Sequence, residues 1–259
     1  MLCPLLAAGA ASSADLNEAW LAIANSHPKD ALRKLDESDP ARAVQLARAV
    51  ALMAQQSATD DNVRAAEKIF VELATGNDEP ADEAAYLQAR LYQLHYVQPD
   101  YAKAAELYQA LAQRHPRSHW AQLGLVKLAL LKLYVVPDTT AAGSDRLAPA
   151  EALLAQISDP LLQRDLNLQI GQAGVALKQP LARFLPHLVA ADRVGGITAT
   201  AREDLIVQIG VLSMRAGDWA QAKKYFERYL VEFPNNVRAY DVKLNLDDAI
   251  RHLAKRAGS

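Results

Sequence analysis

The sequence predicts an all-α fold of antiparallel helical hairpins stacked into a solenoid, and three observations support this. Alanine, the residue with the highest helix propensity, makes up roughly a fifth of the 259 residues. Glycine and proline, which interrupt helices, occur only 11 and 12 times. Apolar residues recur at helical spacing, and no run alternates between apolar β-branched and polar residues as a half-buried strand would. Long stretches of the chain can therefore form helices, and no sheet is expected.

Amphipathic segments separated by short breaks give the order of the expected helices. They are predicted at residues 15–26, 29–37, 40–57, 62–75, 81–97, 100–114, 118–134, 147–157, 160–177, 180–193, 200–216, 219–232 and 236–255. Most of the breaks are short, which favours antiparallel packing of consecutive helices. The exception is Val135 to Ala148, which is a long connection rich in small residues.

Several breaks carry the residues that begin and end helices. Asp39 and Asp159 each precede a proline, the pattern of an N-cap carboxylate before proline at the first helical position. Thr200 and Asp218 each stand three residues before a glutamate or glutamine, which is the spacing of a capping box. Gly217 is a stop signal, because glycine tolerates the left-handed conformation in which many helices end.

The most regular unit lies near the C-terminus. It reads Ile206-x-x-Ile209-Gly210, then Gly217-Asp218-Trp219, Ala222-x-x-x-Phe226 and Pro234. We expect Gly210 and Ala222 to lie where two helices cross closely, since larger side chains would push the helices apart. Phe226 is expected to fill the space between one hairpin and the next, and Pro234 to end the second helix.

Partial copies of this unit occur upstream. They are Ala66-x-x-x-Phe70; Leu91, Tyr101, Ala104-x-x-x-Tyr108 and Pro116; Trp120-x-x-Leu123-Gly124; and a degenerate unit from Asp159 to about Val194 with Gly171 as its close-packing glycine. The pattern resembles the tetratricopeptide repeat, a helical hairpin of 34 residues. The resemblance implies a right-handed α-solenoid whose first helices line a concave, peptide-binding groove. The degenerate repeats and the N-terminal segment also resemble bacterial envelope proteins of this class, among them tol-pal accessory proteins and outer-membrane assembly lipoproteins.

The N-terminal segment, residues 1–14, differs from the rest of the chain. It has no charged side chain, and Ala8-Gly9-Ala10 fits the cleavage pattern of a secretory signal. The positively charged start of such a signal is missing, so a disordered terminus is the alternative. Residues 15–259 are predicted to form a single solenoid of about five to six hairpins and a C-terminal helix. The protein is expected to be periplasmic or secreted if residues 1–14 are a signal peptide, and otherwise cytoplasmic.

The sequence offers no catalytic constellation. It contains none of the metalloprotease, serine-hydrolase, P-loop or dinucleotide-binding motifs, and its single cysteine, Cys3, has no dedicated base. His115 and His119 are four residues apart, but Pro116 between them argues against a shared metal. His187 follows Pro186 inside a helical pattern and reads as a packing or kink residue. We therefore predict a non-enzymatic protein without a cofactor or metal.

Charge and hydropathy limit the partners. The formal net charge is −2 with no cluster of lysine and arginine, which argues against nucleic acid. After the first residues, no uncharged apolar stretch is long enough to cross a membrane. The expected partner is a protein or peptide.

The groove positions implied by the repeat carry the candidate binding residues. They are Tyr86, Gln93, Tyr96, Val211, Met214 and Arg215. Such a mixture of aromatic, apolar and arginine side chains is typical of interface cores. The alternative for Tyr86 and Tyr96 is packing within the hairpin stack. The predicted function is a protein-binding scaffold, and the alternative is a structural module that self-associates.

Overall fold

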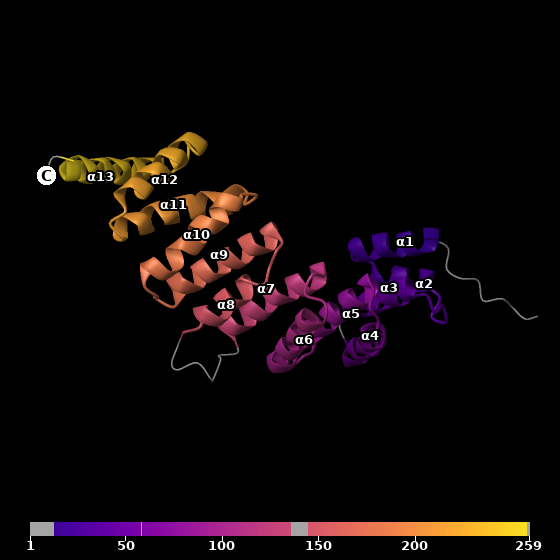
Figure 1. The fold of residues 1–259 in the computed structure, drawn as a ribbon. Coiled ribbons are helices and arrows are strands. Elements are labelled where there is room, and N and C mark those ends of the chain that lie inside the picture. The colour runs from indigo at the N-terminus through magenta and orange to yellow at the C-terminus, as the bar shows by residue number, and fades with distance from the viewer. Residues whose placement is uncertain (1–12, 58, 136–144, 258–259) are drawn as a thin grey trace, which may run out of the picture. The chain divides into compact units, whose positions relative to one another are not determined.

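The structure is a computed structural model that describes residues 13–57, 59–135 and 145–257, and within these ranges every regular element is a helix (Figure 1). The elements are α1 (Ser13–Ala24), α2 (Pro28–Lys34), α3 (Arg42–Met53), α4 (Asp60–Leu73), α5 (Glu79–Arg90), the π-helix η1 (Leu91–His95), α6 (Tyr101–Arg114), α7 (His119–Tyr134), α8 (Leu147–Leu154), α9 (Pro160–Ala176), α10 (Leu181–Val194), α11 (Ala199–Arg215), α12 (Trp219–Glu232) and α13 (Ala239–Ala257). The prediction of an all-α fold is confirmed.

The chain divides into two compact units, residues 1–131 and residues 132–259. In the first unit the helices pack as sequential pairs, α1 with α2, α3 with α4 and α5 with α6. In the second unit α9 packs with α10, and α12 packs with both α11 and α13. This is the pairing expected of helical hairpins joined by short connections. The single solenoid over residues 15–259 stays a prediction.

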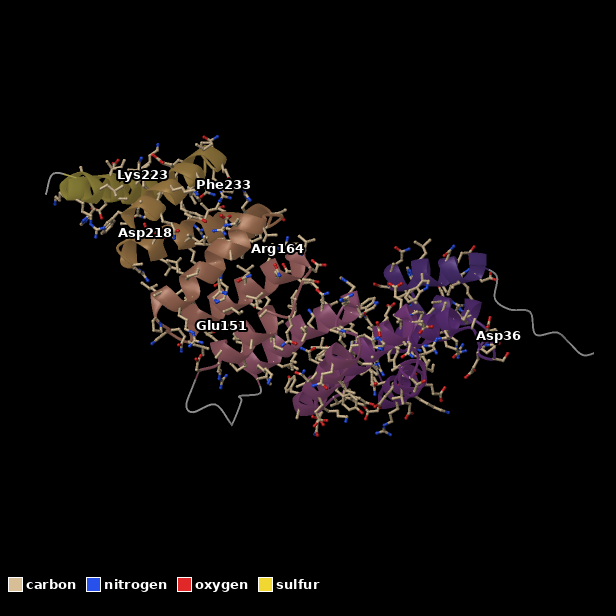
Figure 2. All side chains as sticks on the ribbon, in the orientation of Figure 1. Asp36, Glu151, Arg164, Asp218, Lys223 and Phe233 are labelled. Atoms are coloured by element: carbon tan, nitrogen blue, oxygen red, sulfur yellow. The ribbon has the colours of Figure 1, made fainter. Side chains whose placement is uncertain are left out.

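Aspartate side chains cap the N-termini of two helices, as the sequence predicted. The Asp159 carboxylate accepts hydrogen bonds from the backbone N–H groups of Leu161 and Leu162, at 2.8 and 3.2 Å. The Asp218 carboxylate accepts from the N–H of Gln221 at 3.0 Å. Asp218 and Phe233, which directly follows α12, are both labelled in Figure 2. These contacts satisfy N–H groups that have no partner inside the helix.

Two predicted caps are wrong. Helix α3 begins at Arg42 rather than at Pro40, and Asp39 instead accepts a hydrogen bond from the N–H of Ala41 in the turn before it. Helix α11 begins at Ala199, whereas capping by Thr200 would start it at Ala201, and its N-cap Thr198 makes no side-chain cap bond. In both cases the predicted capping residue lies close to the helix start but not at the N-cap position.

The small-and-aromatic pairs of the second helices form the core of the hairpins. Each alanine and each aromatic ring of this pattern is fully buried, namely Ala66 with Phe70 on α4, Ala104 with Tyr108 on α6, and Ala222 with Phe226 on α12. Since residues four apart lie on one helix face, the spacing directs both members of each pair into the core. The repeat pattern therefore marks the buried side of these helices.

Glycines permit close helix contact in the hairpin of α9 and α10. A Cβ atom at Gly171 would lie 2.3 Å from Cδ2 of Leu188, and one at Gly174 would lie 2.2 Å from Cβ of Phe184. Both distances are far below van der Waals contact, so neither position has room for alanine without displacement of α10. The prediction that Gly171 is a close-packing glycine is confirmed, whereas the sequence analysis missed Gly174.

Two sequence predictions fall on residues outside the described ranges. The leader hypothesis concerns residues 1–14, of which 1–12 are not described, and most of the long connection, residues 136–144, is not described either. The leader hypothesis stays a prediction. Among the helices of the described ranges, none combines the length and the apolar character needed to cross a membrane.

Candidate protein-binding surfaces

A π-helical turn in the first unit positions two of the candidate residues, Gln93 and Tyr96. The sequence predicted an uninterrupted helix over residues 81–97, but α5 ends at Arg90 and η1 continues it with a wider turn. Tyr92 in η1 and Tyr96 directly after it both donate a hydrogen bond to the carboxylate of Glu67 on α4. Their rings lie 5.3 Å apart. The widened turn thus brings two hydroxyl groups to one carboxylate.

The other candidates of this unit are also engaged within it. The hydroxyl of Tyr108 donates to the side-chain oxygen of Gln93 at 2.8 Å. Tyr86 is 4% exposed, and its ring packs against Tyr108 and Trp120 with centroid distances of 5.8 and 5.4 Å. Tyr86 therefore packs within the hairpin stack, which was the alternative to a place in the groove. Gln93 and Tyr96 are partly exposed, and each uses its polar group inside the unit.

Replacing Tyr92 by phenylalanine should reduce the loss of stability at alkaline pH. The hydrogen bond to Glu67, burial and the charge of Glu67 raise the pKa of Tyr92 to about 12, above the value of about 10 in an unfolded chain. Because the folded state favours the neutral phenol, its stabilising contribution is complete below pH of about 10 and is lost as the pH rises to about 12. Urea unfolding across this range measures the difference.

The matched control is Tyr240→Phe, because Tyr240 is 69% exposed. Tyr240→Phe should keep the alkaline slope of the parent protein, whereas Tyr92→Phe should flatten it. Identical slopes for all three proteins would show that the contact between Tyr92 and Glu67 contributes no pH-dependent stability.

The three candidates of the second unit lie close together on α11, and we call Val211, Met214 and Arg215 the α11 face. Val211 and Met214 are partly exposed, and Arg215 is exposed. Beside them, the side-chain amides of Gln208 on α11 and Gln172 on α9 are hydrogen-bonded at 3.0 Å. The α11 face therefore combines apolar area with a guanidinium that has no ion-pair partner among the described residues, next to a hydrogen-bonded amide pair.

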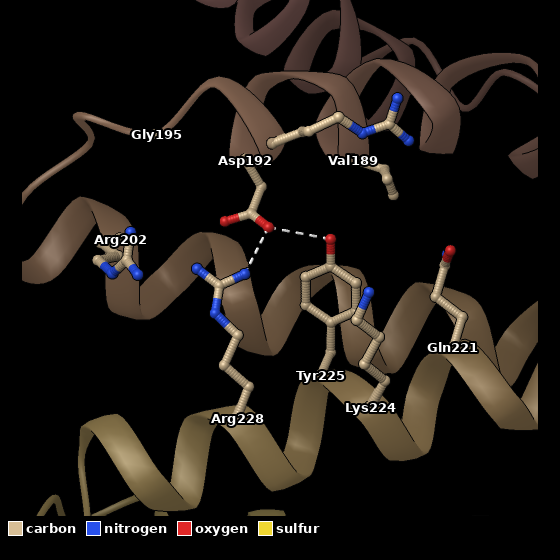
Figure 3. A pocket seen from close by; sticks show the side chains of 9 residues that line it. Val189, Asp192, Gly195, Arg202, Gln221, Lys224, Tyr225 and Arg228 are labelled. Atoms are coloured by element: carbon tan, nitrogen blue, oxygen red, sulfur yellow. Dashed lines mark hydrogen bonds and ion pairs between the residues drawn. The ribbon is translucent and has the colours of Figure 1, made fainter.

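A pocket that the sequence analysis did not identify also lies in the second unit, between α10, α11 and α12 (Figure 3). Its volume is about 460 Å³. We call it the basic pocket, since four of its lining residues are arginine or lysine. It is lined by Val189, Asp192, Arg193, Gly195, Arg202, Gln221, Lys224, Tyr225 and Arg228.

An ion-pair network forms one end of the basic pocket. Asp192 accepts hydrogen bonds from the hydroxyl of Tyr225 at 3.0 Å and from the guanidinium of Arg228 at 2.6 Å, as Figure 3 shows. Arg228 also contacts Glu232 at 2.8 Å, and Arg202 pairs with Glu232 through two bonds of 2.7 and 3.0 Å. The hydrogen bond from Arg202 holds the pKa of Glu232 below its usual value, and Arg228 acts in the same direction. Glu232 is therefore charged, and it pairs with both guanidinium groups.

The histidines singled out from the sequence, His115, His119 and His187, lie beside other side chains. His187, in α10 directly after Pro186, has Nδ1 2.8 Å from the side-chain oxygen of Asn167, and burial lowers the pKa of its imidazole. His115 Nε2 lies 3.8 Å from Asp82 Oδ1, too far for a hydrogen bond, while the His119 ring contacts the ring of Trp120. Within the part of the chain that the structure describes, no three histidine, cysteine or acidic residues are grouped as metal ligands.

One family model matches a part of the chain. Residues 204–236 match the tetratricopeptide repeat. These residues comprise most of α11, all of α12 and Pro234, so the match covers the unit from which the sequence analysis inferred the repeat. Domains of this family are typically non-catalytic protein-interaction modules, and no catalytic family matches. None of the curated proteins matches the chain. Nothing in these comparisons supports the likeness to envelope proteins.

Proposed function

We propose that the protein is a non-catalytic scaffold that binds a segment of a protein partner on the α11 face. The observation that carries the proposal is the tetratricopeptide repeat at residues 204–236, since repeats of this kind serve as protein-interaction modules. The α11 face lies within this repeat, and it is the group of candidate residues with both apolar area and a free charged group. The proposal names the partner only by its class, a protein or peptide.

The chemistry of the α11 face suits such a partner. Met214 has a flexible side chain that adapts to irregular apolar surfaces. Arg215 offers several hydrogen-bond donors in a planar group. By contrast, Tyr86, Gln93 and Tyr96 make contacts within the first unit, so a partner would have to compete with those contacts. The α11 face is therefore the primary site of the proposal.

Replacing both Met214 and Arg215 by alanine should weaken binding to a captured partner by about thirtyfold, the effect of losing a hot spot. The experiment begins with affinity capture from a native lysate using the full chain. The captured protein is then purified and titrated against the parent chain and the variants. The control is Lys223→Ala, since Lys223 lies on α12 and pairs with Glu227 at 3.3 Å. Equal affinities for all folded variants would move the binding site away from the α11 face.

Self-association is the second candidate function, and the last helix favours it. Tyr240 and Leu244 on α13 are 69% and 51% exposed, and they lie four residues apart and so on one face. In repeat proteins a further repeat would stack on such a face. Sedimentation over a range of concentrations separates the two functions, because a scaffold for a foreign partner stays monomeric while a self-associating module does not.

A further inference from the structure

The basic pocket carries more positive charge than its own contacts neutralise. Of its four cations, Arg202 and Arg228 are paired with the carboxylates of Glu232 and Asp192. The other two, Arg193 and Lys224, are exposed and have no ion-pair partner within the described residues. The pocket therefore has an excess of two positive charges.

The excess of positive charge is confined to the pocket and is not a property of the whole chain. The whole chain has a formal net charge of −2, so the pocket is a positive site on a slightly acidic protein. Lys224 comes from α12 and extends toward α10, beside the ring of Tyr225 (Figure 3). Arg193 comes from the last turn of α10 and lines the pocket from that helix. Two cations from different helices can approach one anionic group from two sides.

The paired guanidinium groups form a fixed part of the pocket lining. Arg228 is held by Asp192 and Glu232, and Arg202 is held by both oxygens of Glu232, so their positions are fixed before a ligand arrives. Fixed groups lose little conformational entropy on binding. A ligand oxyanion would therefore meet two fixed guanidinium groups from α11 and α12 and two exposed cations, Arg193 and Lys224.

We propose that the basic pocket binds an acidic segment of a protein partner through side-chain oxyanions, carboxylate or phosphate, held between Arg193 and Lys224. The inference rests on the proposed scaffold function and names the chemistry of a second contact with the partner. A pocket of about 460 Å³ accommodates one or two acidic side chains. A nucleic acid requires a longer row of phosphate contacts than two free cations supply. The site is distinct from the α11 face, which is apolar apart from Arg215.

The test uses the full chain and a short fluorescent peptide, blocked at both ends, in which glutamate alternates with glycine. Two further peptides replace glutamate by phosphoserine or by glutamine. The variant carries Arg193→Gln with Lys224→Gln, and the control carries Lys223→Gln with Lys243→Gln, which lowers the charge of the same unit equally. Lys223 and Lys243 do not line the pocket. Because all four changes are at exposed or half-exposed side chains, each double variant should melt like the parent chain.

We expect the pocket variant to bind the glutamate peptide about tenfold more weakly than the parent chain, and the control to change the affinity by less than about twofold at physiological salt. The glutamine peptide should not bind. Tighter binding of the glutamate or of the phosphoserine peptide identifies which oxyanion the pocket prefers, and either result supports the inference.

Four results would overturn the inference. They are equal losses in both double variants, binding of the glutamine peptide, displacement of the peptide by a single-stranded oligonucleotide at lower concentration, and concentration-dependent self-association that only the pocket variant loses. The last two would assign the pocket to nucleic acid or to a second copy of this chain. Failure of the capture experiment would instead contradict the scaffold function, while the peptide measurement would still decide on the pocket.

Discussion

Replacing Gly210 by leucine is expected to lower the free energy of unfolding of the second unit by about 3 kcal/mol, the upper end of the usual cost of overpacking. A Cβ atom at this position would lie 2.5 Å from Cε1 and 2.8 Å from Cδ1 of Phe226. Phe226 is fully buried and is part of the core between α11 and α12. Its ring cannot retreat without opening a gap elsewhere, because protein interiors are close-packed.

Urea unfolding followed by circular dichroism measures this effect. The chain has two compact units, so the transition should be fitted with a separate step for each unit if the curve is not a single cooperative transition. The matched control is Ala220→Leu, which adds the same side chain at an exposed position of α12. A variant with Gly210→Ala and Phe226→Leu should lose less stability than the sum of the two single changes. If Gly210→Leu unfolds like the control, the two helices are not in close contact at Gly210.

The sequence was sufficient to predict features that depend on local spacing. The alanine and aromatic pairs are four residues apart, so a helical period alone places Ala222 and Phe226 on one buried face. Gly210 and Gly171 were identified because their place in the repeat requires a residue without a side chain, and the distances to Phe226 and Leu188 confirm this. Asp218 caps α12 through a contact only three residues away. None of these inferences needs the relative position of distant helices.

The features that the sequence did not predict depend on tertiary contacts. The contact of Tyr92 and Tyr96 with Glu67 requires the π-helical turn and the packing of α4 beside η1. Tyr86 was assigned to a groove because it fits a repeat offset, but Tyr108 and Trp120 bury its ring.

The basic pocket joins cations that are far apart in the sequence, since Arg193 and Lys224 are brought together by α10 and α12. The spacing of Lys224 and Arg228 on one helix face was the one available signal, and by itself it is typical of an ordinary solvated face.

Replacing Asp192 by alanine should also destabilise the second unit strongly, by about 2–4 kcal/mol. Asp192 is 9% exposed and accepts hydrogen bonds from the Tyr225 hydroxyl and the Arg228 guanidinium. Tyr225 is buried as well and lines the basic pocket, so its hydroxyl would lose the protein acceptor that orients it. Arg228 is partly exposed and keeps its contact with Glu232, which places the expected cost below that of breaking a fully buried ion pair.

Three further variants, Asp192→Asn, Tyr225→Phe and Tyr225→Phe in the alanine background, separate the hydrogen bonds from the charge of Asp192. Asp192→Asn keeps a side-chain oxygen that can accept from Tyr225 and should cost about 1 kcal/mol. Tyr225→Phe in the alanine background removes the orphaned hydroxyl and should restore part of the lost stability, because a buried donor without an acceptor is worse than an apolar group of similar shape. Urea unfolding of the parent chain, Asp192→Ala, Tyr225→Phe and the double variant completes the double-mutant cycle, and Asp192→Asn is measured beside them. If Asp192→Ala and Asp192→Asn are equally stable, or if Tyr225→Phe adds its full cost in the alanine background, then the charge of Asp192 and not its hydrogen bond to Tyr225 holds α10 and α12 together.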